Sequence, residues 1–157
     1  MKKLFVPLLL SCLLASCDDE PACCDHLAEF PMIQVFDAND EDLLDPNNEN
    51  HYEHSGISLT TDVDESRKQL EMEIRRRMLS AVDSAAYIIN VTDNEMIRFL
   101  TEPGTRNYYL LLNKNTVDTI TLVITSSIRT EKILVNEMET EMVENELENF
   151  LLTIKKI

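Results

Sequence analysis

Hydrophobic and polar residues alternate most regularly between Thr119 and Thr125. Ile120, Leu122 and Ile124 fall on one side of this segment, and threonines fall on the other. Alternation with a period of two is the pattern of a β-strand that buries one face. We therefore expect a strand here, with its isoleucine and leucine side chains in a core.

Shorter apolar segments, separated by turn-forming residues, recur along most of the chain. They are rich in β-branched, aromatic and leucine residues and are bounded by polar residues, Gly or Pro. Pro31 suits the first residue of an edge strand, and Ile57 and Leu59 should face inward. We expect strands at Phe30–Phe36, Gly56–Thr61, Ala86–Thr92, Met96–Leu100, Asn107–Leu112, Glu131–Val135 and Phe150–Ile154, with Asn107–Leu112 a buried strand. Strands of this kind predict a mainly β fold, a single antiparallel β-sandwich that is Ig-like or related.

The segment from Asp64 to Asp83 fits two kinds of secondary structure. Leu70, Ile74 and Met78 are spaced as on one face of a helix, whereas Leu70, Met72 and Ile74 alternate as in a strand. Its Glu, Arg, Lys and Gln residues favour a helix by intrinsic propensity, which is a weak determinant. The β-rich surroundings favour a strand or an irregular hairpin instead.

The amino terminus has the features of a secretory signal. Met1-Lys2-Lys3 is a basic head, and the apolar stretch that follows is shorter than the roughly 20 residues that span a bilayer. The stretch ends in Leu14-Ala15-Ser16-Cys17, which resembles the lipobox of bacterial lipoproteins. The resemblance implies cleavage before Cys17 and attachment of a diacylglycerol to its thiol. The alternatives are a weaker box ending at Cys12, a signal peptide cut elsewhere, or a short membrane anchor.

These features divide the chain into three parts. Residues 1–16 are expected to be a lipoprotein signal peptide, 17–29 a lipidated flexible tether, and 30–157 the β-sandwich domain. Within that domain, the acidic segment Glu137–Asn149 is compatible with a hairpin or one short helix. By resemblance, Cys17 carries several acyl chains, which would make membrane anchoring stable.

Acidic residues follow the predicted lipid site directly. Asp18-Asp19-Glu20 resembles the surface-export signal of lipoproteins from the Bacteroidetes group, which implies display on the outer face of the outer membrane. The alternative is a charged tether with no export role, which leaves the periplasmic face open. We expect a lipid-anchored outer-membrane protein in either case.

Charge and glycine content exclude several classes of function. Removal of the signal peptide leaves 12 basic residues against 29 acidic ones, a formal charge of −17, which disfavours nucleic acid and anionic lipid surfaces as partners. The two glycines, Gly56 and Gly104, are far apart, so Gly-rich phosphate loops are excluded. Cys23 and Cys24 are adjacent, so the domain has no internal disulfide framework.

One loop carries enough oxygen ligands to be considered for calcium. The pattern departs from an EF-hand, because Asp42 stands where the turn glycine belongs and Asn48 where the bidentate Glu belongs. The simpler interpretation is a solvated turn whose side chains bond nearby backbone N–H groups. The candidate ligands are Asp37, Asn39, Glu41 and Asp45, with Asp42 among them in sequence.

Two other clusters contain residue types used in metal binding or catalysis. His51, Glu53 and His54 could ligate zinc, but their spacing is one residue short of the helical arrangement and their flanks are loop-like, which favours exposed histidines. The run Cys24-Asp25-His26 holds a thiol, a carboxylate and an imidazole, but neighbours on a tether cannot converge as a triad does. We expect no catalytic residues, no metal and no cofactor.

The mature chain has one basic cluster, Arg75-Arg76-Arg77. It could meet an acidic partner. The simpler interpretation is that it balances Glu71 and Glu73 across a sheet face or a helix turn.

Four short strings resemble small uncharacterised Bacteroidetes cell-envelope lipoproteins. The first two are Ile33-Gln34-Val35-Phe36-Asp37 and the turn Asp42-Leu43-Leu44-Asp45-Pro46. The others are Tyr108-Tyr109-Leu110-Leu111-Leu112 and Asp118-Thr119-Ile120. The resemblance implies a single β-rich domain at the envelope and no particular chemistry.

The function expected from the sequence is that of a membrane-anchored envelope lipoprotein. It would face the cell surface and have a non-enzymatic structural or partner-binding role. The alternative is a glycan- or calcium-binding accessory module of an uptake system. An enzyme is disfavoured, because no nucleophile, metal set or acid–base pair stands out in so acidic a chain.

Overall fold

The computed structural model describes residues 30–63, 66–79, 84–93, 102–125, 130–140, 143–144 and 150–157. The predicted signal peptide, the tether with Cys17, Cys23 and Cys24, and the strand expected at Met96–Leu100 lie outside the described residues. A short 3-10 helix, η1 (His54–Gly56), precedes the second strand. The strands are β1 (Met32–Phe36), β2 (Ser58–Val63), β3 (Ser66–Gln69), β4 (Met72–Leu79), β5 (Ser84–Val91), β6 (Gly104–Asn113), β7 (Thr116–Ile124), β8 (Thr130–Val135), β9 (Met138–Thr140), β10 (Val143–Glu144) and β11 (Phe150–Lys155).

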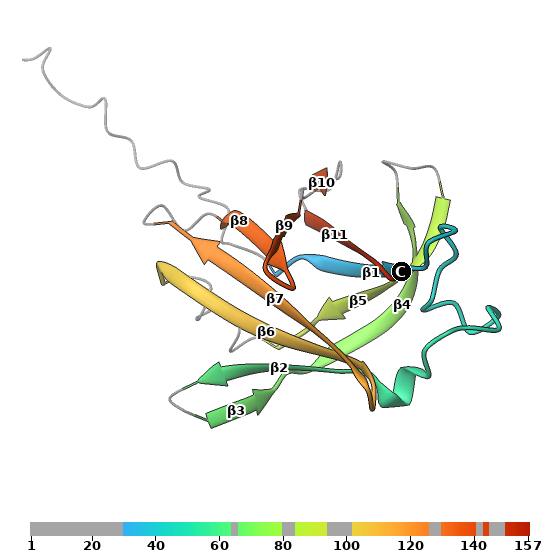
Figure 1. Ribbon diagram of the computed structural model, residues 1–157, viewed down its shortest axis with the longest axis horizontal. Helices are drawn as coiled ribbons and strands as arrows, with labels where there is room; N and C mark the ends of the chain where they lie inside the picture. The colour runs from blue at the N-terminus through green and yellow to red at the C-terminus, as the bar shows by residue number, and fades with distance from the viewer. Residues whose placement is uncertain are drawn as a thin grey trace, which may run out of the picture.

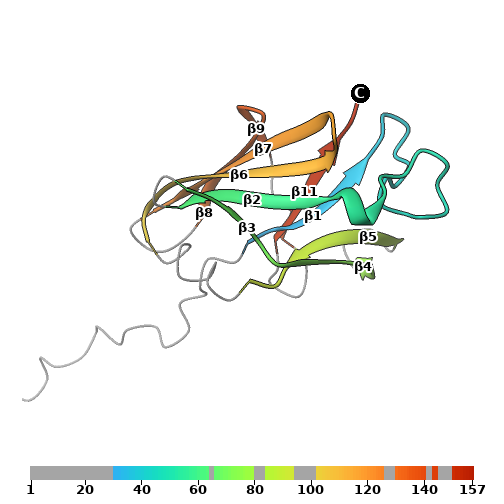
Figure 2. The ribbon, with the colours of Figure 1, turned by 90° about the horizontal axis from the view of Figure 1, so that it is seen from below.

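The strands form two sheets that pack face to face as a β-sandwich (Figures 1 and 2). One sheet has the order β10-β11-β1-β5-β4, and the other has the order β3-β2-β6-β7-β8-β9. The predicted mainly β sandwich is therefore confirmed, and the described residues contain no α-helix. Most neighbouring strands are antiparallel, but β1 and β11, the first and last of the described strands, are parallel.

The predicted alternation in β7 is confirmed. Ile120, Leu122 and Ile124 are at most 3% exposed and lie in the core between the sheets. Burying one such side chain contributes about 1.5–3 kcal/mol, so this face holds the strand in its register. In β6, however, only alternate residues are buried, and Tyr109 and Leu111 are half-exposed. The prediction of a buried strand from Asn107 to Leu112 therefore holds for one face only.

Strand β1 lies in the middle of its sheet, between β11 and β5, so its predicted edge position is wrong. Pro31 precedes the first paired residue and withholds no backbone donor from the ladder. Ile33 belongs to the core between the sheets, whereas Met32, on the opposite face, belongs to a second cluster with Ile88 and Leu151. Both faces of this strand are therefore buried, as a central position requires.

The segment predicted as a strand or hairpin around residues 64–83 forms two strands of different sheets. Strand β3 is the edge of the six-stranded sheet, and β4 is the edge of the five-stranded sheet. Leu70 and Glu71 are the only residues between them, so the chain crosses from one sheet to the other within two residues. The hairpin expectation is therefore wrong, because β3 pairs with β2 and β4 pairs with β5.

A buried ion pair joins the two sheets near the carboxyl terminus. Asp118 lies on the inward face of β7 and is 2% exposed. Its carboxylate accepts hydrogen bonds from Lys156 Nζ, just beyond β11, and from Asn136 Nδ2 at 2.9 Å. Burial, and then the negative charge of Asp118, raise the pKa of Tyr52. Asp118 is thus a buried carboxylate that is paired with a cation and hydrogen-bonded.

The turn between β8 and β9 consists of Asn136 and Glu137. Both have positive φ angles, 50° and 68°, which is the geometry of a two-residue type I′ hairpin. Asn136 tolerates this geometry well, and its side-chain Oδ1 also accepts a hydrogen bond from the N–H of Thr119 at 2.9 Å. Glu137 occupies a position that glycine usually fills.

Candidate binding groove

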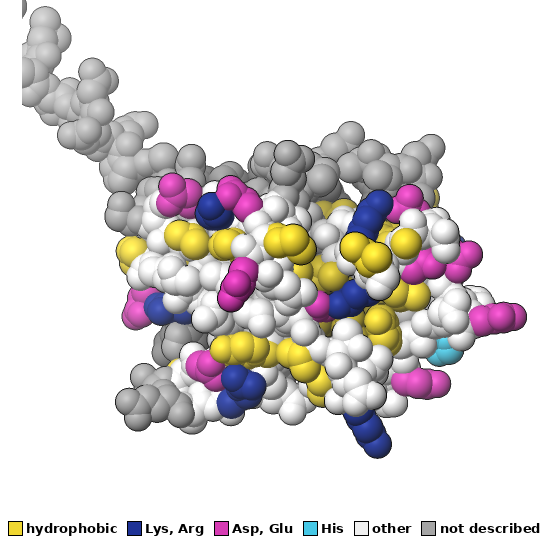
Figure 3. Space-filling view, in the orientation of Figure 1, with side chains coloured by type: hydrophobic (Ala, Val, Ile, Leu, Met, Phe, Trp, Pro, Cys, Tyr) yellow, Lys and Arg dark blue, Asp and Glu magenta, His cyan; other side chains and the backbone are white. Residues whose placement is uncertain are grey.

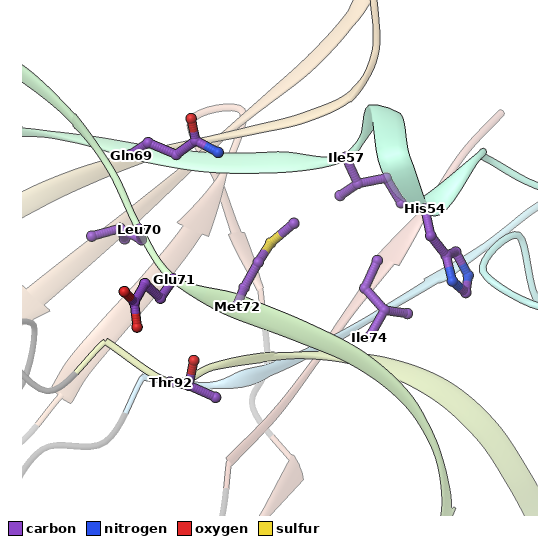
Figure 4. Close-up of a pocket in the computed structure, with 8 residues that line it drawn as sticks. All are labelled: His54, Ile57, Gln69, Leu70, Glu71, Met72, Ile74 and Thr92. Atoms are coloured by element: carbon purple, nitrogen blue, oxygen red, sulfur yellow. The ribbon is translucent and has the colours of Figure 1, made fainter.

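A groove of about 740 Å³ opens at the edge of the sandwich where the chain crosses from β3 to β4. Strand β3 pairs with the last four residues of β2, from Thr60 to Val63. The first two residues, Ser58 and Leu59, therefore have no strand beside them on that side among the described residues. Because β4 joins the other sheet, the two sheet edges separate here and leave the groove between them (Figure 4).

The base of the groove is apolar. Ile57 and Leu70 are 6% and 4% exposed and belong to the main core, and Met72 and Ile74 are half-buried against it. Figure 4 shows Met72 and Ile74 extending from β4 toward Ile57. The polar side chains of Gln69, Glu71 and Thr92 form the rim. An apolar base with a polar rim suits an apolar side chain of a partner.

His54 closes one end of the groove and is held in place. Its Nε2 lies 2.7 Å from the carbonyl oxygen of Leu44, to which it donates as the Nε2–H tautomer. Its ring packs against that of Tyr87, with 5.8 Å between the ring centroids. The imidazole is therefore a wall of the groove, since its donor is already used.

The zinc ligands considered from the sequence, His51, Glu53 and His54, are dispersed. Both histidines are half-buried, so the expectation of exposed histidines is wrong. His51 Nδ1 lies 2.6 Å from the carbonyl oxygen of Asn48, and its Nε2 is 3.9 Å from Glu53. His54 bonds to a different carbonyl, so the two rings serve separate backbone contacts. Within the described residues, no three His, Cys, Asp or Glu side chains gather as a metal site would require.

The predicted calcium ligands lie in two consecutive turns and bond to their own backbone. Asp37 Oδ1 accepts from the N–H groups of Asn39 and Glu41 at 2.8 and 2.9 Å. Asp45 Oδ1 accepts from the backbone and side-chain amides of Asn47 at 2.9 and 2.8 Å. The backbone bond from Glu41 lowers the pKa of Asp37, and that from Asn47 lowers the pKa of Asp45. These contacts are those of the solvated-turn interpretation.

Asp42 fixes this acidic loop to the sandwich, which the sequence did not indicate. Its Oδ1 accepts from the N–H of Leu44, and its Oδ2 accepts from the N–H of Tyr87 in β5, both at 2.8 Å. Tyr87 in turn packs on His54. The loop, the groove wall and β5 are therefore connected through one carboxylate.

Strand β4 forms one wall of the groove and presents a free edge. It pairs with β5 along its whole length, from Met72 with Val91 to Leu79 with Ser84. Among the described strands, none pairs with the other edge of β4. Alternate backbone N–H and C=O groups of the strand therefore face away from the sheet.

The arginine cluster lies on this edge strand. Arg75 is 3.1 Å from Glu73, which confirms the predicted pairing with a neighbouring acidic residue. Arg77 contacts Met32 Sδ at 2.9 Å, so its side chain lies on the outer face of the sheet. Arg76, on the opposite face, is exposed and contributes to the lowered pKa of Asp45. The strand thus carries positive charge on both faces.

The face of the molecule seen in Figure 3 carries charges of both signs. Figure 3 shows Asp and Glu side chains spread over one face with Lys and Arg among them, and hydrophobic side chains between. The arginine cluster is therefore a local exception in an acidic chain.

The site was only partly visible in the sequence. The sequence shows the arginine cluster and the alternation of Met72 and Ile74, but it does not indicate that these residues flank a groove, because the groove depends on the crossing at Leu70. The candidate run from Cys24 to His26 lies outside the described residues.

Comparison with known proteins gives no relative. No family model matches the chain, and no curated protein or solved structure matches it. In the part of the chain that is described, no helix is long and apolar enough to span a membrane.

Proposed function

We propose that this protein is a lipid-anchored lipoprotein of the outer membrane whose β-sandwich binds a partner protein at the groove beside β4. The lipid is carried by Cys17, and the domain faces the cell surface. Its role is non-enzymatic. The lipobox, the acidic residues after it and the resemblance to Bacteroidetes lipoproteins support the location.

The observation that carries the binding role is the free edge of β4 beside an apolar-based groove. Edge strands left open are binding or aggregation sites, and natural proteins usually cover or blunt them. Here the edge runs for eight residues and borders a groove of about 740 Å³. A strand of this length with a groove beneath it offers a partner both backbone hydrogen bonds and side-chain pockets.

The proposed anchor is compatible with such a role. The tether from residue 17 to residue 29 has 13 residues, which span at most about 45 Å when fully extended. That reach would let the domain meet a partner in the same membrane. Several acyl chains would hold it there stably, because each buried methylene contributes about 0.8 kcal/mol.

The anchoring is tested by comparing Cys17→Ala with Cys23→Ala in the native host. The first variant should lose labelled palmitate and leave the membrane fraction, and the second should retain both. Proteolysis of intact cells should degrade the wild-type domain if it faces outward. A Cys17→Ala protein that still carries palmitate and remains with the membrane would refute the proposal.

A further inference from the structure

We infer that the free edge of β4 binds an extended acidic segment of the partner, which joins the five-stranded sheet as a further strand. The inference rests on the proposed function and names the chemistry of the partner. Three features carry it: the open edge, the groove and the position of the arginines.

The open edge supplies the backbone part of recognition. Strand β4 is the last strand of its sheet in the described chain and is paired with β5 along its eight residues. An incoming strand would bond to the N–H and C=O groups that face away from β5. It would extend the sheet beneath Ser58 and Leu59 at the start of β2, where β3 does not pair.

The groove would receive the inward side chains of this added strand. Met72 and Ile74 point into the space that faces Ile57, and Leu70 closes it on the side of the crossing (Figure 4). Alternate side chains of a strand enter the same side, so those opposite Met72 and Ile74 should be apolar.

The arginines supply charge complementarity on both faces of the edge. Arg75 and Arg77 lie on the outer face, and Arg76 lies on the inner face toward Asp45. Acidic residues on either face of an added strand would therefore lie opposite an arginine. Arg75 is 44% exposed and pairs with Glu73, and such an exposed pair exchanges partners at little cost.

Acidic neighbours restrict where the partner's acidic residues can lie. Glu71 and Glu73 flank the first half of β4, where they would repel carboxylates. The arginines occupy the second half. The predicted segment is therefore apolar opposite Met72 and Ile74 and acidic opposite Arg75, Arg76 and Arg77.

A second copy of the chain is the alternative occupant of this edge. In an antiparallel pairing of two β4 strands about Arg76, each Arg75 would face an Arg77 and the two Arg76 residues would face each other, and like charges opposite one another are destabilising. Pairing about Ile74 would instead place Arg75 opposite Glu73 and Arg77 opposite Glu71. The oligomeric state of the protein is therefore one outcome of the test.

The probe is a synthetic peptide of eight residues, the length of β4, with both termini blocked. One half contains Val and Thr, the other consists of Glu so that carboxylates lie on both faces, and both chain directions are made. One control replaces Glu with Lys. A second keeps the charge but places Pro at alternate positions, which removes backbone donors. Binding is measured by calorimetry with the lipidated full chain in neutral detergent, and amide hydrogen exchange locates it.

We expect the Glu peptide to bind and to protect alternate amides from Met72 to Leu79, while neither control peptide does. Arg76→Glu should weaken binding about tenfold, and Arg76→Gln by an intermediate factor. Lys114→Glu makes the same charge change at an exposed turn between β6 and β7 and should alter binding less than about twofold.

Three results would overturn the inference. They are equal binding of the Pro peptide, equal effects of Arg76→Glu and Lys114→Glu, and no change in exchange along β4. If no peptide binds, and the protein dimerises with protection of the β4 amides, the edge binds a second copy of the chain and the inference fails. Membrane fractionation of the Cys17 variants is scored separately, so failure of the anchor and failure of the β4 site are distinguishable.

Discussion

Replacement of Lys156 with alanine would leave a buried carboxylate without its cation. The side chain of Asp118 is 3% exposed, and Lys156 Nζ is its charged partner. The pair joins β7 of one sheet to the segment after β11 of the other. Its loss should therefore weaken the packing of the two sheets as well as the carboxyl-terminal segment.

The expected cost follows from the burial of each partner. Removing one member of a fully buried ion pair costs about 3–5 kcal/mol. Here the side chain of Lys156 is 20% exposed, so water can replace part of the contact, and Asn136 still donates to the carboxylate. We expect Lys156→Ala to lower the free energy of unfolding by about 2–3 kcal/mol.

The adjacent lysine provides a matched control. Lys155 pairs with Asp40 at 2.6 Å, but the two side chains are 59% and 71% exposed. Exposed pairs contribute at most about 1 kcal/mol, so Lys155→Ala should cost less than that. Urea unfolding of the mature chain measures both variants, provided that the denaturant slope stays constant.

A double variant separates the charge from the packing. Asp118→Asn with Lys156→Met removes both charges and keeps similar volumes, so it should regain much of the stability that Lys156→Ala loses. The reasoning would be refuted if Lys156→Ala cost no more than Lys155→Ala, since the buried pair would then contribute nothing measurable.

Three further predictions concern single residues. Glu137→Gly should raise the free energy of unfolding by about 0.5 kcal/mol, measured by urea unfolding, because glycine adopts the 68° φ of this turn without strain. Burial raises the pKa of Tyr108 from 10.0 to about 12, because the folded protein favours the neutral phenol over the phenolate. This preference contributes fully to the free energy of unfolding below pH 10, and the contribution is lost as pH rises toward 12. That loss should be about 3 kcal/mol and smaller in Tyr108→Phe. Asp42→Ala should lower the free energy of unfolding by about 2 kcal/mol, measured by urea unfolding, because it leaves the backbone N–H groups of Leu44 and Tyr87 without their acceptor.

The fold was largely predictable where each strand has one buried face. In β7, alternate isoleucine and leucine residues repeat over several positions, so the strand and its inward face follow from the sequence alone. The central position of β1 could not be predicted in this way. It depends on pairing with β11, more than 100 positions away, and no local pattern records that contact.

The crossing between the sheets was the main feature that local patterns could not give. Leu70, Ile74 and Met78 fit a helix, whereas Leu70, Met72 and Ile74 fit a strand, and the interpretation favoured from the sequence is a strand or an irregular hairpin. The chain instead changes sheet at Leu70 and Glu71, where the N–H of Leu70 donates to the carbonyl of Leu59 at 2.9 Å. Tertiary packing decides that this segment forms two strands in different sheets, and it overrides the weak local preferences of the residues.

The groove follows from that crossing and was missed for the same reason. Its residues come from the loop before β2, the crossing segment, β4 and the end of β5. The pair Asp118 and Lys156 was missed because the two residues are 38 positions apart and an acidic chain offers many equivalent partners. Local turns were easier, since Asx residues such as Asp37 and Asp45 bond within a few residues.

Mass spectrometry of the purified protein's first peptide tests the central claim most directly. If the chain is a lipoprotein, the peptide begins at residue 17 and its mass exceeds that of the bare sequence by a diacylglycerol and an amide-linked acyl group. A peptide that begins elsewhere, or that carries no added lipid mass, would contradict the account.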